Sequence, residues 1–244
     1  MTSILRTVFT LLVLVVLTVV FATLLVLAAL VAVPNRAGSI YDVLPRIWAR
    51  AALWAAGVEV RVHGMDHLPA DGAFVLLCNH VSLFDIPALV GFLPRNNFIA
   101  KAELFRIPIF GQGIRVLGTV PIERANQKSA FSSYEIAAAR IRSGSSVVVF
   151  PEGTRGREYP IRGFKKGPFV LAIKAQAPIV PVVIYGTIEI LPKGALLIHP
   201  GVIDVYVLEP VPTAGLSYDD RDTLANTVQE RMQSVMDGLL PQPK

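Results

Sequence analysis

The sequence predicts an α/β fold, with a mixed central sheet flanked by helices and preceded by an N-terminal hydrophobic, membrane-anchoring helix. Three observations support this prediction. Short β-branched runs alternate with helical intervals along most of the 244 residues. Two of these runs end directly in polar loops, as strands do at the edge of an α/β sheet. Residues 1–33 are strongly apolar, and the mean hydropathy of the chain, +0.55, is high for an ordinary soluble domain.

The N-terminal apolar segment is long enough to cross a membrane. Residues 7–33 contain no charged side chain and only threonine as a polar residue. Because a hydrocarbon core about 30 Å thick needs about 20 helical residues, we expect a hydrophobic helix over residues 4–33. A cleaved signal peptide is the alternative. The apolar stretch exceeds the usual length of about 7–15 residues, and no clear cleavage site follows it, so we expect the segment to be retained.

A second helix is expected at about residues 41–57, where apolar side chains alternate with arginines around Trp48. This pattern is typical of a helix at the membrane interface, and packing on the globular domain is the alternative. Residues 1–57 together form the predicted membrane anchor. Only Arg6 precedes the apolar segment, whereas four arginines follow it: Arg36, Arg46, Arg50 and Arg61. This asymmetry predicts a membrane protein whose main domain lies on the cytoplasmic face.

Residues 58–216 form the predicted main domain, in which strands and helices alternate. The expected strands are residues 59–62, 74–78, 97–100, 116–122, 146–150, 179–184 and 202–208. Helices are expected at residues 86–92, 129–142 and 168–176. Residues 217–244 are expected to form an amphipathic helix packed on this domain. It begins with a possible capping box of Ser217 and Asp220, and its apolar stripe consists of Leu224, Val228, Met232, Val235 and Leu239.

Charge and cysteine content limit the kinds of binding partner, disulfide and metal site that the chain can have. The formal net charge of +5 suits an anionic membrane surface and anionic substrates. No basic run interleaved with aromatic residues is present, so we do not expect nucleic-acid binding. The single cysteine, Cys78, excludes an internal disulfide and is expected to be a packed core thiol. His63 and His67 have a metal-like spacing, but Gly64 and Pro69 disfavour the helix that such a site needs, and we expect no metal.

A histidine and an aspartate follow the first buried run of the main domain. His80 comes directly after the apolar run 73–78, and Asp85 lies five residues further on. Five helical residues turn the chain to about 140° from alignment, so the two side chains meet only if the segment forms a tight turn. In that case Asp85 accepts the Nδ1 proton of His80 and leaves Nε2 free as a general base. If this pair is considered without the rest of the chain, a purely structural role for His80 is the alternative.

A second motif follows the β-branched run 147–149, where Phe150 and Pro151 lead into the polar residues Glu152, Gly153, Thr154 and Arg155. Together, H-x-x-x-x-D and F-P-E-G-T-R resemble the motifs of the glycerolipid acyltransferase family, which contains the lysophosphatidic acid acyltransferases. Residues 101–111 fit a further block of this family, K-x-x-L-x-x-x-P-x-x-G, and residues 118–124 and 177–182 fit two others. The resemblance covers about residues 58–211. The chain departs from the family pattern at Pro121, where an aromatic is common, and at Gly156, where serine often follows the arginine.

The resemblance implies a glycerol-3-phosphate acyltransferase-like fold and direct acyl transfer without a cofactor. It implies that His80 is the general base and that Asp85 fixes its tautomer. The donor would be acyl-CoA or acyl-carrier protein, and the acceptor a lysophospholipid, above all lysophosphatidic acid. Because guanidinium and ammonium groups bind phosphate, Arg155, Arg124 and Lys101 are the candidate acceptor contacts. Glu152, Gly153 and Thr154 are expected to shape the acceptor pocket, although Glu152 has an alternative role as an ion-pair partner of Arg155.

Two rival functions remain open at the level of sequence. One is an acyltransferase with another acceptor, such as glycerol 3-phosphate or a lyso-aminolipid. The other is a non-catalytic, lipid-binding membrane protein on the same scaffold. Fold resemblance alone does not choose the acceptor. The presence of His80, Asp85, Glu152 and Arg155 together argues against a loss of activity.

Overall fold

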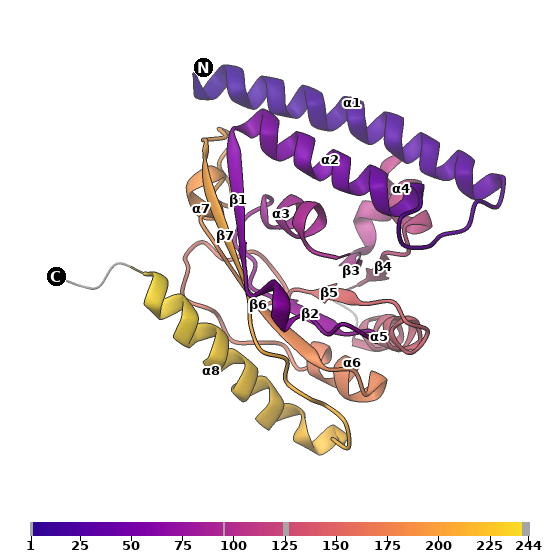
Figure 1. The fold of residues 1–244 in the computed structure, drawn as a ribbon, viewed down its shortest axis with the longest axis vertical. Coiled ribbons are helices and arrows are strands. Elements are labelled where there is room, and N and C mark those ends of the chain that lie inside the picture. The colour runs from indigo at the N-terminus through magenta and orange to yellow at the C-terminus, as the bar shows by residue number, and fades with distance from the viewer. Residues whose placement is uncertain (1, 95, 124–126, 241–244) are drawn as a thin grey trace.

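A single mixed sheet forms the centre of the molecule (Figure 1). The computed structural model describes residues 2–94, 96–123 and 127–240. In this part of the chain the sheet has seven strands in the order β1-β7-β6-β2-β5-β3-β4. Their bounds are Val58–His63 (β1), Val75–Cys78 (β2), Asn97–Lys101 (β3), Val120–Ile122 (β4), Val147–Val149 (β5), Ile179–Tyr185 (β6) and Gly201–Val207 (β7).

The strand directions bring the loops of interest to one edge of the sheet. Strands β6, β2, β5, β3 and β4 are parallel to one another, whereas β7 runs antiparallel to β6. Strand β1 is parallel to β7. Strand β2 is buried along its whole length, as expected for a central strand covered on both faces. Because β2, β5, β3 and β6 point the same way, the segments that follow them emerge at the same edge.

Helices cover both faces of the sheet (Figure 1). One face carries α2 (Ile40–Ala56) and α3 (Asp85–Phe92), with α1 (Ser3–Leu30) outside α2 and α4 (Phe110–Val116) packed against α1. The other carries α5 (Gln127–Arg142), α6 (Gly167–Ala175) and α8 (Arg221–Leu239). Successive residues of β2 alternate between these layers, since Leu77 packs with α5, α6 and α8 and Leu76 packs with α2 and α3. Short helical turns complete the fold at Met65–His67, Ala102–Arg106, Thr187–Ile190 (α7) and Tyr218–Asp220.

Helix α1 lies along α2 and α4 rather than apart from the domain. The indole Nε1 of Trp48 on α2 donates a hydrogen bond of 2.9 Å to Thr18 Oγ1 on α1. The outer side of α1 is open, and α1 is long and apolar enough to cross a membrane. Its exposed apolar side chains include Ile4, Leu5, Val8, Leu11, Leu12, Val15 and Val16. Helix α1 therefore has one side against protein and one side available to lipid.

Helix α2 packs on α3, which is the arrangement given above as the alternative to an interfacial helix. Its buried side consists mainly of small residues, with Leu53 in the core between α2 and the sheet. The opposite side leaves Val43, Ile47 and Trp54 exposed. Contact with the membrane interface by this side stays a prediction.

The largest error of the sequence analysis concerns residues 110–122. Residues 116–122 were predicted to form a strand, but only Val120–Ile122 does so, and Val116 ends α4. Gly111 and Gly113 disfavour a helix, and the close approach of Gly113 to α1 explains why glycine stands there. Helix α1 also ends at Leu30, short of position 33, because the chain turns into a left-handed conformation at Ala32.

Other local predictions are confirmed. Ser217 and Asp220 form the capping box, although it caps the turn Tyr218–Asp220, and α8 itself begins at Arg221. Leu224, Val228 and Met232 of the predicted stripe are buried in the core. Cys78 is buried as expected, and this burial raises the pKa of its thiol well above the ordinary value.

The contact between α4 and α1 gives a testable prediction. An added Cβ at Gly113 would lie 2.7 Å from Ala22 Cβ, whereas one at Gly238 on α8 would meet nothing within 4 Å. Alanine normally stabilises a helix by about 1 kcal/mol relative to glycine, but overpacking costs about 1–3 kcal/mol. We therefore expect Gly113→Ala to lower the thermal unfolding temperature in detergent and Gly238→Ala to leave it unchanged or raise it. Equal shifts in the two variants would contradict the tight contact between α1 and α4.

Candidate active site

His80 and Asp85 contact each other at the carboxyl end of β2. The Asn79 side chain first extends the pairing with β6, since it donates to Ile184 O at 2.9 Å and accepts from Ile184 N at 2.7 Å. The chain then turns without helical structure until α3 begins at Asp85. This turn places His80 Nδ1 2.7 Å from Asp85 Oδ2. The predicted tight turn and the contact it allows are therefore confirmed.

The Asp85 carboxylate is fully buried and surrounded by hydrogen-bond donors. Besides the imidazole, Oδ2 accepts from the amides of Val81 at 2.8 Å and Ser82 at 2.9 Å. The other oxygen, Oδ1, accepts from Thr187 Oγ1 at 2.7 Å. An ionised carboxylate only accepts hydrogen bonds, so this set of donors suits a buried negative charge. Nδ1 of His80 is therefore the donor to Asp85, and in the neutral imidazole with this tautomer Nε2 presents its lone pair.

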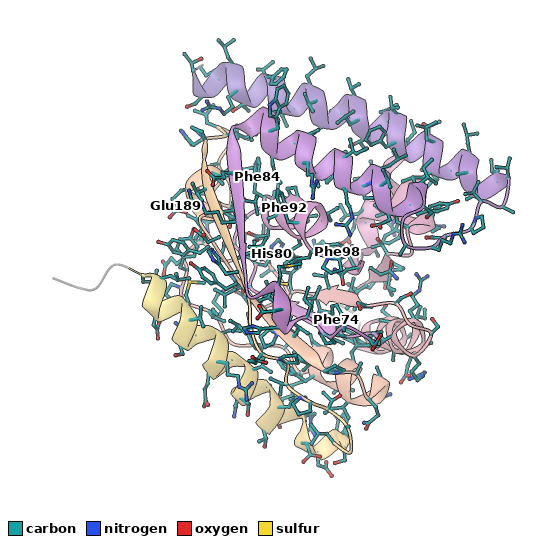
Figure 2. All side chains as sticks on the ribbon, viewed as in Figure 1. Phe74, His80, Phe84, Phe92, Phe98 and Glu189 are labelled. Atoms are coloured by element: carbon teal, nitrogen blue, oxygen red, sulfur yellow. The ribbon has the colours of Figure 1, made fainter. Side chains whose placement is uncertain are left out.

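The imidazole ring is held in a fixed orientation and stays partly accessible. It stacks on Phe150, with ring centroids 4.0 Å apart and an angle of 15° between the planes. Figure 2 shows His80 near the centre of the molecule, with Phe84 and Phe92 on its α2 side. The His80 side chain is 12% exposed, and Nε2 has no hydrogen-bond partner within the described part of the chain. A base at this position can take a proton from a hydroxyl group that enters the site.

The loop after β5 is tied directly to His80. Glu152 is buried, and its Oε1 accepts from the His80 amide at 2.8 Å while Oε2 pairs with Arg162 Nε at 2.8 Å. The amide of Gly156 donates to His80 O at 2.7 Å. Burial raises the pKa of Glu152, and the hydrogen bonds from the His80 amide and Arg162 oppose this shift. The ion-pair partner of Glu152 is thus Arg162. The alternative prediction, an ion pair between Glu152 and Arg155, is wrong.

The other predicted residues that the structure describes lie at the same edge of the sheet. Gly153 adopts a left-handed conformation with φ of 76°, and the carbonyl of the exposed Thr154 accepts from Arg162. Arg155 is half-buried, and its carbonyl accepts from Lys193 Nζ at 2.8 Å. Lys101 is exposed at the end of β3. Arg124 lies outside the described residues.

The structure therefore brings three of the predicted residues into direct contact: His80, Asp85 and Glu152. Arg155 lies on the loop that is bonded to His80 through Gly156. Among the described residues, no hydrogen bond or ion pair joins Lys101 to this group.

Several residues of the site were missed at the level of sequence. Phe150 belongs to the quoted motif, but its stacking on His80 was not anticipated. Arg162 follows Glu152 by ten residues, and nothing in the sequence shows that the intervening loop returns. Thr187 follows β6, and its only signal in the sequence is that it is a polar residue just after a predicted strand.

Two cavities flank this edge of the sheet. A cleft of about 660 Å³ between α5 and α6 is lined by residues 150–154 and by Tyr134, Lys165, Pro168 and Lys174. An apolar cavity of about 180 Å³ lies on the opposite face, among α1, α2, α3 and α4. It reaches Ile86, the neighbour of Asp85, and its chemistry suits a hydrocarbon chain. Within the described residues, no three His, Cys, Asp or Glu side chains gather as a metal site.

Comparison with known proteins places this geometry in a family. The family model described as Acyltransferase matches residues 59–185, which include His80, Asp85 and their side-chain hydrogen-bond partners except Thr187. A human 1-acyl-sn-glycerol-3-phosphate acyltransferase alpha is 36% identical over 181 residues, covering 73% of this chain and 64% of the human one. A putative 1-acyl-sn-glycerol-3-phosphate acyltransferase of Caenorhabditis elegans is 34% identical over 179 residues, covering 72% and 64%.

A solved structure extends the similarity to nearly the whole chain. The crystal structure of the 1-acyl-sn-glycerophosphate acyltransferase of Thermotoga maritima superposes with a TM-score of 0.83 at 28% sequence identity. The match covers 99% of this chain and 98% of that one. By contrast, the chain spans less than two thirds of the length of the two curated relatives named above. Because the family model matches just over half of the chain and includes both motifs, the protein belongs to the acyltransferase family.

Proposed function

We propose that the protein is an O-acyltransferase that moves a fatty acyl group from acyl-CoA or acyl-carrier protein to the sn-2 hydroxyl of 1-acyl-sn-glycerol-3-phosphate, giving phosphatidic acid. The observation that carries this proposal is the 2.7 Å contact between His80 Nδ1 and Asp85 Oδ2 at a strand end. The names of the human, nematode and bacterial relatives support the choice of acceptor. The partly exposed side chain of His80, whose Nε2 has no hydrogen-bond partner among the described residues, supports a role in proton transfer.

The proposed reaction needs one base and no covalent enzyme intermediate. His80 Nε2 takes the proton of the acceptor hydroxyl while the hydroxyl oxygen attacks the thioester carbonyl. A C–O bond forms, and the tetrahedral intermediate carries the negative charge on the former carbonyl oxygen. When the intermediate collapses, the C–S bond breaks and the thiolate leaves, taking the proton back from the imidazolium. The Asp85 carboxylate stabilises the imidazolium between these two steps.

The acceptor phosphate is assigned to the cations near the strand ends. Lys193 binds the carbonyl of Arg155, so the backbone of the loop is held while the guanidinium stays available. Arg155 is the principal phosphate contact in this proposal, and Lys101 and Arg124 are further candidates. Glu152, Gly153 and Thr154 shape the loop, and the apolar cavity beside Ile86 suits an acyl chain.

We propose that α1 attaches the protein to a membrane and that the catalytic domain lies on the cytoplasmic face. The open apolar side of α1 supports attachment, and the excess of arginines after the apolar segment supports this orientation. A lysophospholipid already resides in the bilayer. Attachment would therefore bring His80 to the surface where the acceptor is found.

The role of His80 is tested by substitution. We expect His80→Ala to lower kcat by roughly 10²–10⁴-fold, because no second base is assigned to the acceptor proton. Asp85→Asn should also be severely impaired, since an amide can donate to Nδ1 and stabilise the wrong tautomer. Thiol release from acyl-CoA is the measurement, with lysophosphatidic acid, glycerol 3-phosphate and a lyso-aminolipid as acceptors.

Cys78→Ala is the matched control for this test, because its thiol is buried just before the turn and has no role in the proposed reaction. It should retain turnover. Near-normal kcat in folded His80→Ala protein would falsify the base assignment. A preference for glycerol 3-phosphate or the lyso-aminolipid would replace the proposed acceptor, and no turnover by the wild type with any acceptor would favour the non-catalytic alternative.

The phosphate contact is tested by a substitution that keeps the charge. Arg155→Lys removes the two parallel donors of guanidinium, so we expect the KM for lysophosphatidic acid to rise about tenfold while the donor KM changes little. Arg157→Lys, at an exposed position two residues away, is the control and should leave both KM values unchanged. If Arg155→Lys lost as much activity on a phosphate-free acceptor, Arg155 would shape the loop rather than bind phosphate.

Membrane attachment is tested in the full-length chain. Leu12 and Val16 are exposed on the outer side of α1, so Leu12→Glu with Val16→Glu should spare the fold but oppose insertion into lipid. We expect this variant to stop floating with lipid vesicles in a flotation assay. Its activity should fall further on a bilayer-embedded acceptor than on a short-chain, water-soluble acceptor. Ser234→Glu, on the exposed side of α8, is the control. Unchanged flotation would show that the open side of α1 is not the attachment surface.

A further inference from the structure

The segment after β6 contacts both motifs of the site, although it lies just beyond residue 185, where the family match ends. Thr187 donates to Asp85 in the first motif, and the carbonyl of Leu191 accepts from Ser82 Oγ at 2.8 Å in the same turn. Lys193 binds the carbonyl of Arg155 in the second motif. Residues 187–193 therefore support both motifs at once. Of these three links, the one from Thr187 reaches the catalytic pair most directly.

The hydroxyl of Thr187 has a distinct place among the partners of Asp85. Oδ2 has three donors, and all of them belong to the turn of residues 80–82. Oδ1 has Thr187 Oγ1 as its partner in the described chain, at 2.7 Å, and Thr187 is itself fully buried. Without that hydroxyl, Oδ1 would be a buried acceptor with no donor. The carboxylate would then gain by rotating so that the two oxygens share the donors of the turn.

The backbone around Thr187 is held by contacts within the protein. Gly186 has φ of 93°, and a Cβ there would lie 2.1 Å from Val202 O, so only glycine lets the chain pass this close to β7. The amides of Gly186 and Ile188, on either side of Thr187, donate to Tyr159 Oη at 2.8 Å and 3.3 Å. The Tyr159 hydroxyl in turn donates to Glu189. The Thr187 hydroxyl is thus presented to Asp85 from a rigid support.

We propose that Thr187 is a positioning residue for proton transfer at His80. It holds Oδ1 of Asp85 so that Oδ2 stays in line with the Nδ1–H of His80, and this alignment keeps the Nε2 lone pair directed at the acceptor hydroxyl. Thr187 does not touch the substrate. The inference rests on the proposed role of His80 as the base, and it adds a third group to the pair that the sequence motif names.

Isosteric and conservative variants separate the hydroxyl from its packing. Thr187→Val keeps the shape and removes the donor, so we expect kcat to fall about tenfold, the effect of one lost buried hydrogen bond, with both KM values nearly unchanged. Thr187→Ser restores the hydroxyl and should stay within about threefold of the wild type. Thr213→Val is the matched control, because Thr213 is also buried and donates to Ala177 O at 2.8 Å, away from the site. It should leave kcat unchanged.

A double-mutant cycle tests whether Thr187 acts through Asp85. In an Asp85→Asn background, Thr187→Val should lower kcat by less than about threefold further, because the carboxylate that Thr187 holds is gone. The tautomer of His80 gives a readout that needs no turnover. By ¹⁵N NMR the wild type should carry the proton on Nδ1, and Thr187→Val should show a mixture of the two tautomers.

The possible results of these experiments separate an error in the role of Thr187 from an error in the proposed function. If the wild type turns over and His80→Ala is inactive, but Thr187→Val matches the wild type in kcat and tautomer, the inference is wrong while the proposed function stands. Equal losses in Thr187→Ser and Thr187→Val, or independent losses in the Asp85→Asn background, would assign Thr187 to packing alone. Should Thr187→Val fail to fold, Thr187→Cys replaces it, since a thiol is a weaker donor of similar size and predicts an intermediate kcat. An active His80→Ala protein would instead reject the proposed function itself.

Discussion

A buried carboxylate is the constraint on which the site depends. The Asp85 side chain is removed from water, so its charge is tolerated only with several donors close by, and the fold supplies them from two separate segments. The turn of residues 80–82 wraps around one oxygen, and the start of α7 reaches the other. The same need that shapes the turn also orients the imidazole. In this site, the local fold and the arrangement for proton transfer have one cause.

The parallel strands explain why so few contacts suffice to assemble the site. Strands β2, β5 and β6 are neighbours that point in one direction, and each ends in a segment that carries part of the site. Glu152 then joins two of these segments, since one of its oxygens binds the His80 amide and the other binds Arg162. Two buried carboxylates, Asp85 and Glu152, thereby fix the backbone on both sides of the imidazole. The loops are held by charge and hydrogen bonds, and the strands provide only their starting points.

The sequence predicts what depends on neighbouring residues and misses what depends on distant ones. The strand before His80 was predicted from an apolar run, and the contact with Asp85 was expected only if the segment between them formed a tight turn, which it does. Helix α4 was missed because Gly111 and Gly113 oppose a helix locally, while the reason for Gly113 is α1, some ninety residues earlier in the chain. Arg162 and Thr187 were missed because their partners become neighbours only when the sheet has formed. Local periodicity in the sequence does not predict which distant residues will contact each other.

The contact between α1 and α4 limits which helices could take the place of α1. Ala22 meets Gly113, and Ala22 and Leu25 also line the apolar cavity that reaches Ile86. The inner side of α1 is therefore part of the wall of a binding space, while the outer side is open. A chimera that carried a foreign hydrophobic helix of equal length would keep the outer chemistry and replace that wall. In this protein the N-terminal helix forms part of a cavity wall with one side and an open apolar surface with the other.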